Sequence, residues 1–324
     1  MKISRGISGL GFGGISVTSL TFKTVDDISL AGRACAVTAT GITNIPTFYV
    51  NKRSCVDGVW TIEALDRAAF VDRNVNMTGC TKYRNNTMYA VTDFVSKIQS
   101  DCGFSAVTIP YSPYTDPTLI ACEEVDGKTY QTVLTSIAQA YGGFFYVNSS
   151  GALVFSLFYD VTSYMAAAAY SRIKRNGTYK YGSVTASDGQ TTNTYGNSLP
   201  EYKVNNNFVD FRNGVCVSAY NALVTETFTG VQIDNVVIGG LSLPYPNSTI
   251  VFGNDTYRIA SIEARVVGDT LIMSMSSSLP SEGEISRRGR LQKELDEKVS
   301  TEKTYGTLMT AYQGAIAVPN GGSV

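Results

Sequence analysis

The chain has 324 residues, of which 44% are hydrophobic and only 16% are charged, and its formal net charge is −1. This length predicts two or three domains with a sizeable core. The near-neutral charge argues against a nucleic-acid-binding protein, which carries a basic excess. Because the chain has no histidine, it lacks the commonest general base and transition-metal ligand, so we expect no catalytic residue, cofactor or metal.

No targeting or membrane segment is evident. The N-terminal sequence MKISRGISGLGFGG lacks the apolar core of a signal peptide, and no apolar run reaches the roughly 18 residues that a membrane helix needs. We therefore expect a protein made in the cytoplasm that does not insert into a membrane. The cysteines occur singly, without a CxxC pair, and are interpreted as reduced and mostly buried. They are Cys35, Cys55, Cys80, Cys102, Cys122 and Cys216.

The N-terminal region, taken as residues 1–58, is β-rich. Apolar and polar residues alternate over Ile15–Phe22, Ala34–Thr40 and Thr47–Asn51, with Gly, Asp and Pro between these runs. This pattern predicts a small antiparallel sheet or barrel.

Residues 59–176 are expected to form an α/β unit. It begins with a strand, contains two amphipathic helices, and includes a hairpin that directly follows the second helix after Gly142-Gly143. Four consecutive alanines predict a further short helix. The segments are the strand Val59–Leu65, the helices Tyr89–Cys102 and Lys128–Tyr141, the hairpin Phe144–Phe158 and the short helix Tyr164–Lys174.

The remainder is a polar segment, a second β region and a charged tail. Residues 177–206 are rich in Gly, Ser, Thr and Asn, which predicts a long loop or interdomain connection, or else the completion of a barrel. Residues 207–279 are expected to form a second small barrel or sandwich. Its strands are Val215–Val224, Gly230–Leu241, Ser248–Gly253, Thr256–Val267 and Asp269–Ser277.

Residues 280–324 are predicted to contain a charged helix with one sparse apolar stripe. Such a helix needs a partner to be stable, so the stripe is the candidate partner interface. Its residues are Ile285, Leu291, Leu295 and Val299. The whole pattern predicts a mixed, mainly β (α+β) fold with two β-barrel domains, an α/β insert between them and a C-terminal helix.

Two patterns in the sequence could indicate catalysis or ligand binding. Gly9, Gly11 and Gly14 match G-x-G-x-x-G, but a β-like segment follows where a dinucleotide site needs a helix, so a flexible Gly-rich segment is the preferred interpretation. Carboxylates could serve a glycan hydrolase, but each candidate lies beside a turn or on a strand edge, where solvated acids are usual. These candidates are Glu63, Asp66, Glu123, Glu124 and Asp126.

The order of these elements resembles the baseplate hub, or tail-associated, family of bacteriophage tails and phage-derived contractile particles. The resemblance rests on a G-x-W-x-I-x-A-x-D-R strand at Gly58–Arg67, the two helices that follow, and the sequence IAQAYGGFFYVNSSGALVF at Ile137–Phe155. A second β region before a polar helix extends it over about residues 15–300.

The resemblance implies a structural virion protein without catalysis. Three chains of such a hub, each with two tube-like barrels, form a ring that adapts the sixfold tail tube to the threefold spike and continues the central channel. The implied partners are two further copies, the tube or tube-initiator protein, a separate spike protein, baseplate wedge proteins and the tape measure. A receptor- or glycan-binding tail-tip module is the alternative, and a cell-wall hydrolase is a more remote one.

Overall fold

The chain is described from a computed structural model, and all described residues lie in one compact unit, Met1–Leu279. The predicted C-terminal helix, with Ile285, Leu291, Leu295 and Val299, lies outside the described part. The described residues are 1–6, 14–26, 34–35, 43–83, 86–109, 119–121, 125, 127–158, 164–187, 189, 191–205, 217–238, 242–252, 254–267 and 270–277.

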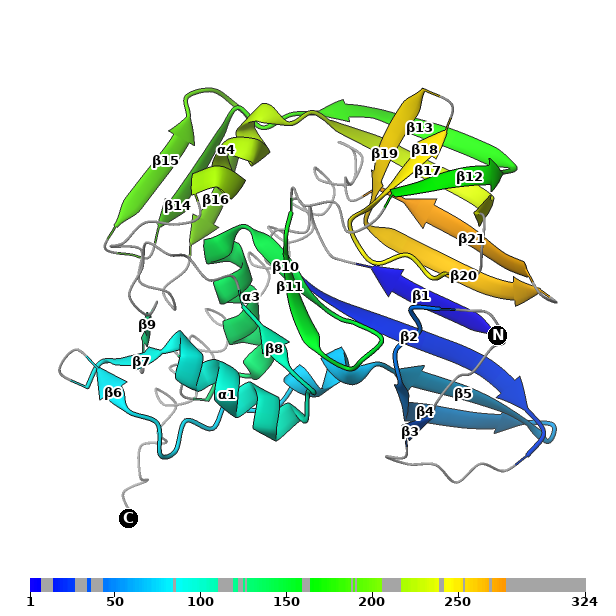
Figure 1. The fold of residues 1–324 in the computed structure, drawn as a ribbon, viewed down its shortest axis with the longest axis horizontal. Helices are drawn as coiled ribbons and strands as arrows, with labels where there is room; N and C mark the ends of the chain where they lie inside the picture. The colour runs from blue at the N-terminus through cyan, green and yellow to red at the C-terminus, as the bar shows by residue number, and fades with distance from the viewer. Residues whose placement is uncertain are drawn as a thin grey trace, which may run out of the picture. The chain divides into compact units, whose positions relative to one another are not determined.

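The unit is mainly β, as the sequence predicts (Figure 1). Its helices are α1 Val91–Cys102, α3 Tyr130–Tyr141, α4 Val217–Thr225 and the 3-10 helix η1 Arg67–Val71. Its strands are β1 Lys2–Gly6, β2 Ile15–Thr24, β3 Ala34–Cys35, β4 Phe48–Val56, β5 Val59–Leu65, β6 Lys82–Tyr83, β7 Met88–Ala90, β8 Val107–Thr108, β9 Leu119–Ala121, β10 Gly143–Val147, β11 Leu153–Leu157, β12 Tyr164–Ala169, β13 Arg172–Tyr179, β14 Ser183–Ser187, β15 Thr192–Gly196, β16 Glu201–Asn205, β17 Phe228–Ile238, β18 Ser248–Phe252, β19 Asp255–Ile259, β20 Ser261–Val267 and β21 Thr270–Ser276.

One large sheet joins strands from both ends of the unit. Its order is β19-β18-β12-β17-β21-β20-β1-β2-β10-β11-β8, with β5 and β4 added beside β2 and β13 beside β17. The blue strand β1 pairs with β2 on one side and with the orange strand β20 on the other (Figure 1). The two expected β regions are therefore parts of one sheet. The separate closed barrels are not found in the described part of the chain.

The β core explains why apolar and polar residues alternate along these strands. Side chains from the N-terminal strands, such as Ile3 and Leu20, lie in the same buried cluster as Ile233, Ile250 and Met273 from the C-terminal strands. Polar residues between these positions point to the opposite face, as expected for a sheet with one buried side. The shared core makes the N-terminal strands dependent on the C-terminal ones.

The predicted α/β unit is confirmed at its two helices and hairpin. In α3, Val133, Leu134, Ile137 and Ala138 are fully buried, and the helix ends at Gly142, whose φ is 70°. A left-handed residue at this place is a common way to end a helix, and glycine adopts it without steric cost. Strands β10 and β11 follow as an antiparallel hairpin. This unit has its own core, which α4 joins through Tyr220 and Leu223.

Two predicted elements have the wrong secondary structure. The expected helix Tyr164–Lys174 is instead β12 and the start of β13, because pairing with β17 and β18 outweighs the helix propensity of alanine. The expected strand Val215–Val224 largely coincides with α4. A short apolar run does not by itself distinguish a strand from a buried helix.

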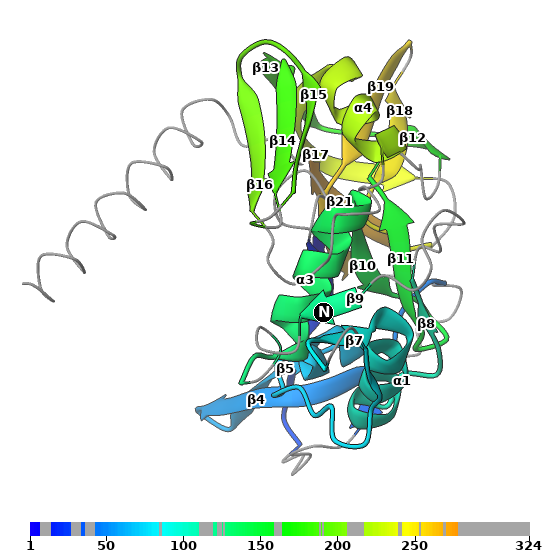
Figure 2. The same ribbon diagram turned by 90° about the vertical axis from the view of Figure 1, so that its left-hand side faces the viewer.

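The polar segment 177–206, for which the sequence predicts a long loop, an interdomain connection or the completion of a barrel, contains a small separate sheet of order β15-β14-β16 (Figure 2). Thr185 on β14 and Thr192 and Thr194 on β15 keep one face polar. Val184 and Ala186 are buried on the other face near α4. The overall polarity obscured this alternation. Strand β1 was also missed, because the sequence Lys2–Gly6 was interpreted as part of a flexible segment.

Candidate functional site

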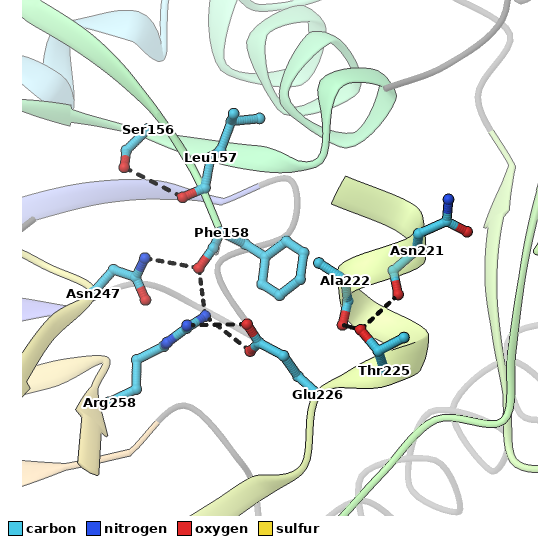
Figure 3. A network of polar contacts seen from close by, with 9 residues as sticks. All are labelled: Ser156, Leu157, Phe158, Asn221, Ala222, Thr225, Glu226, Asn247 and Arg258. Carbon is cyan, nitrogen blue, oxygen red and sulfur yellow. Dashed lines mark hydrogen bonds and ion pairs between the residues drawn. The ribbon is translucent and has the colours of Figure 1, made fainter. Parts of the chain in front are cut away.

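Phe158, which follows β11, is the centre of a polar joint between the α/β unit and the β region (Figure 3). Its carbonyl oxygen accepts a hydrogen bond from Asn247 Nδ2 at 2.8 Å and another from Arg258 Nη1 at 2.6 Å. Arg258 also forms an ion pair with Glu226, at 3.3 Å, directly after α4. One backbone carbonyl is therefore bound by an amide and a guanidinium donor, and the guanidinium also links it to the acid that follows α4.

A second joint surrounds Arg5, whose side chain is almost fully buried. Its guanidinium donates to Thr18 Oγ1 at 3.0 Å and to the carbonyl oxygens of Pro244 at 3.0 Å and Asn44 at 3.1 Å. The guanidinium lies 5.0 Å from the ring centre of Tyr245. Burial lowers the pKa of Arg5 to about 10, although nearby negative charge acts in the opposite direction. Arg5 thus joins β1 to two distant loops.

Asp66, one of the predicted carboxylate candidates, lies close to this second joint and is fully buried. It accepts hydrogen bonds from the backbone N–H groups of Thr18 at 2.9 Å and Ala68 at 3.0 Å, the latter at the start of η1. Burial raises the pKa of Asp66 to about 6, while these hydrogen bonds and Arg5 act to lower it. The carboxylate holds the backbone and has no solvent-facing oxygen for substrate chemistry.

The other catalytic and binding candidates are not brought together. Glu63 lies on β5 opposite Lys52 and Thr21, and Glu123, Glu124 and Asp126 lie outside the described residues. Within the described part, no group of His, Cys, Asp and Glu side chains could hold a metal ion. The structure therefore assembles no carboxylate pair from the described candidates.

The glycine pattern does not have the context of a dinucleotide site. Gly9 and Gly11 lie outside the described residues, and Gly14 leads directly into strand β2, whereas a helix is required. The Gly14 carbonyl accepts a hydrogen bond from the Phe145 N–H at 3.0 Å. Gly14 thus connects β2 to the hairpin.

The described cysteines are reduced as expected, but the expected burial holds only for Cys102, because Cys55 is exposed and Cys80 is half-buried. Cys55, Cys80 and Cys102 are free thiols. Burial raises the pKa of Cys102 to about 11, which makes it an unreactive thiol at neutral pH. The side chains of Cys35, Cys122 and Cys216 lie outside the described part.

The feature best suited to contact another chain is the β4–β5 finger, defined here as residues 51–61. Beyond Val50, β4 pairs only with β5 among the described residues, so no described strand pairs with its other edge. The finger turns at Asp57-Gly58, where both φ angles are positive. At its tip Val56 is 69% exposed, and the Arg53 guanidinium lies 4.9 Å from the Trp60 ring centre.

A second open edge is formed by β13, which pairs only with β17 among the described strands. It carries Arg172, Lys174 and Arg175, and Arg175 forms an exposed ion pair with Asp255 at 2.6 Å. Open strand edges present backbone donors and acceptors that can pair with another polypeptide. The finger and this edge are the candidate interface.

The finger was missed in the sequence, although a signal for it exists. Asp57-Gly58 between two alternating segments is a strong two-residue hairpin signal. It identifies the hairpin but not its exposure, because the edge pairing of β4 depends on distant strands.

Within the described residues, no helix is both long and apolar enough to span a membrane.

Sequence comparisons identify no relative. No protein-family model matches the chain, and no curated protein matches it.

Comparison with solved structures does identify the fold. A 43 kDa tail protein of prophage MuSo2 from Shewanella oneidensis aligns with a TM-score of 0.51 and 16% identity, covering 86% of this chain and 95% of that one. The prophage tail protein gp18 from Listeria monocytogenes has a TM-score of 0.52 and 12% identity, with 91% and 93% covered. A tail protein from Neisseria meningitidis has a TM-score of 0.50 and 14% identity, with 85% and 90% covered. The resemblance is confirmed at the level of the fold, because this chain shares the fold of phage tail proteins.

Proposed function

We propose that the chain is a structural tail hub, three copies of which close into a ring that adapts a sixfold tail tube to a threefold spike and continues the central channel. The observation that carries this proposal is the fold shared with three tail proteins over at least 90% of their lengths. A match of this extent covers both β regions and the α/β unit. Identity of 12–16% transfers the fold, so the function is our inference.

Open strand edges support assembly. The β4–β5 finger and the outer edge of β13 leave backbone groups that a neighbouring copy could pair with. A ring requires heterologous contacts that close, so two different edges on one chain suit it better than one self-complementary patch. We place the ring contacts at these two edges.

The proposed setting is the tail tip or baseplate of a virion or phage-like particle, after synthesis in the bacterial host. The proposed partners are the tube or tube-initiator protein, a separate spike protein, wedge proteins and the tape measure. The role involves no catalysis, cofactor, membrane insertion or specific nucleic-acid binding. The apolar stripe Ile285, Leu291, Leu295 and Val299 is the proposed contact with the spike or a neighbouring chain.

The first test is the molar mass of the purified chain, measured by size-exclusion chromatography with light scattering over a wide concentration range. We expect a discrete trimer, with a central channel visible by electron microscopy. A chain that stays monomeric both alone and with its tube and spike proteins would contradict the ring. Binding of that monomer to cell-wall glycans would favour the receptor-binding alternative, and zymogram activity would favour a hydrolase.

The stripe is tested by Leu295→Asp in the intact particle. We expect particle yield to fall while the circular dichroism spectrum of the isolated chain is unchanged, because the substitution places a charge in an apolar contact. Lys293→Asp on the same segment is the matched control. Normal particle yield for Leu295→Asp would remove the stripe from the proposed interface.

A further inference from the structure

A cleft of about 170 Å³ lies where β4, η1, the end of α1 and the β10–β11 turn meet. Tyr49 and Arg67 line its side and Val147 its buried floor, while Ser105 and Ser150 form an exposed rim. None of the described residues that line it is acidic, and Arg67 is the charged one. The cleft is distinct from the open strand edges proposed for assembly.

Arg67 is held rigidly in this cleft. Its guanidinium lies 4.8 Å from the ring centre of Tyr49 and 5.8 Å from that of Phe70. Nη1 donates to the Cys102 carbonyl oxygen at 3.2 Å, at the end of α1, and Nη2 donates to the Tyr49 hydroxyl. A guanidinium has more N–H groups than these two bonds use. Its remaining N–H groups have no hydrogen-bond partner among the described residues.

The neighbouring hydroxyls extend this donor set. The Tyr49 oxygen accepts from Arg67, which leaves the phenolic O–H able to donate. Thr47, also on the rim, has no hydrogen-bond partner among the described residues. A rigid fork of N–H donors with adjacent O–H donors matches the two oxygens of a carboxylate.

We propose that this cleft binds a single carboxylate group, as carried by a glutamate or aspartate side chain or by a small organic acid. The volume fits one such group and is below the roughly 300 Å³ at which pockets for larger ligands begin. This inference is independent of ring formation and goes beyond the proposed hub function. It assigns to Arg67 a ligand-binding role in addition to its bond with the end of α1.

Arg73 provides an internal comparison. Its guanidinium lies 5.3 Å from the Phe70 ring centre, and Nη1 donates to the Asp101 carbonyl oxygen at 2.8 Å. Arg73 therefore also bonds the end of α1 and contacts the same ring, but it does not line the cleft. A purely structural role for Arg67 predicts that the two arginines respond alike.

The test is a titration of the full chain, labelled with ¹⁵N, followed by NMR at low ionic strength. The probes are acetyl-Gly-Glu-Gly-amide, its Gln counterpart, and sodium acetate. We expect saturable shifts at the Arg67 Nε–H and at the Gly103, Ser105 and Gly151 amides with the Glu peptide and with acetate, and none with the Gln peptide. Saturation by acetate alone would assign the cleft to free organic acids.

Two variants separate binding from stability. Arg67→Lys keeps the charge but loses the forked donors, so the affinity for the Glu peptide should fall about tenfold. Arg73→Lys should leave the affinity within about twofold, because this side chain lies outside the cleft. Thr47→Val, at the exposed rim, should weaken binding while the fold is retained. Equal shifts with the Glu and Gln peptides, equal losses for the two Lys variants, or no saturable shift would overturn the proposal.

Discussion

At the scale of single residues, buried charges hold the parts of this fold together. Arg5 and Asp66 lie in the joint beside β1, and Arg258 and Glu226 lie in the joint around Phe158. A buried or half-buried charge is tolerated when hydrogen bonds and an opposite charge offset its desolvation. The D-R dipeptide of the predicted motif has two separate roles, because Asp66 caps η1 while Arg67 lines the cleft.

Asp66 gives stability a defined pH dependence. Its pKa is raised from 3.8 to about 6 in the folded state, so between these values the folded chain retains a proton that the unfolded chain has lost. This contribution is full below the unfolded pKa and is lost as the pH rises through about 6. It amounts to about 3 kcal/mol, in the direction of lower stability at neutral pH.

The measurement is urea unfolding of the wild type and Asp66→Asn at pH 4.5 and pH 7, after circular dichroism has shown that the variant is folded. The variant should lack the Asp66 component, so its loss of stability between the two pH values should be smaller. The same pH dependence in both proteins would show that Asp66 does not titrate in this range.

Arg258 should contribute more to the free energy of unfolding than its ion-pair partner Glu226. Arg258→Ala removes a donor from the Phe158 carbonyl and leaves Glu226 without its ion pair. We expect a loss of about 2 kcal/mol in the free energy of unfolding. Glu226→Gln retains a polar group at the partly exposed position and should cost less than about 1 kcal/mol. Urea unfolding measures both, and a larger effect of Glu226→Gln would contradict this order.

At the scale of elements, Gly142 and Gly143 are required for different reasons. Gly142 adopts the left-handed conformation that ends α3. A Cβ at Gly143 would lie 2.2 Å from the Ser156 carbonyl oxygen and 2.3 Å from the Phe155 ring. Gly143→Ala should therefore lower the free energy of unfolding by about 2 kcal/mol or more.

The control for Gly143→Ala is Ser149→Ala at the exposed turn of the same hairpin. It should change the free energy of unfolding by less than about 0.5 kcal/mol. Thermal unfolding followed by circular dichroism compares the two. Equal melting temperatures for both variants would mean that the hairpin accommodates the added methyl group.

Elements with strong local signals could be predicted from the sequence. The apolar spacing of Val133, Leu134 and Ile137 and the glycine after Tyr141 are sufficient for α3, and the alternation in Val59–Leu65 is sufficient for β5. The alanines of β12 form a strand because β17 and β18 lie beside them, and no local pattern contains that information. The two joints could not be predicted from the sequence either, because residues such as Arg5 and Pro244 are distant in the sequence and meet only in the folded chain.

At the scale of the whole molecule, the exposed finger should contribute to assembly and little to stability. Val56→Asp adds a charge at a site that is 69% exposed, so the free energy of unfolding should change by less than about 0.5 kcal/mol. If the finger lies in the proposed ring contact, the variant should weaken the trimer at least about tenfold by light scattering.

Val267→Asp is the matched control, because this valine is 59% exposed and lies at the end of β20, away from the finger by sequence and pairing. It should leave the molar mass unchanged. Equal effects of the two aspartates would indicate general charge repulsion, and no effect of Val56→Asp would exclude the finger from the contact.

The pairing of β1 with β20 also has a consequence for how the chain reaches its native state. Lys2 faces Arg265 across the sheet, so the first described strand, β1, completes its pairing only once one of the last described strands, β20, has been made. Contacts between such distant residues make folding slow, because a long loop must close before they form. Until then the edge of β1 that later pairs with β20 is exposed and prone to mispairing. During biosynthesis, the interval before β20 emerges is therefore when this chain is most open to mispairing and aggregation.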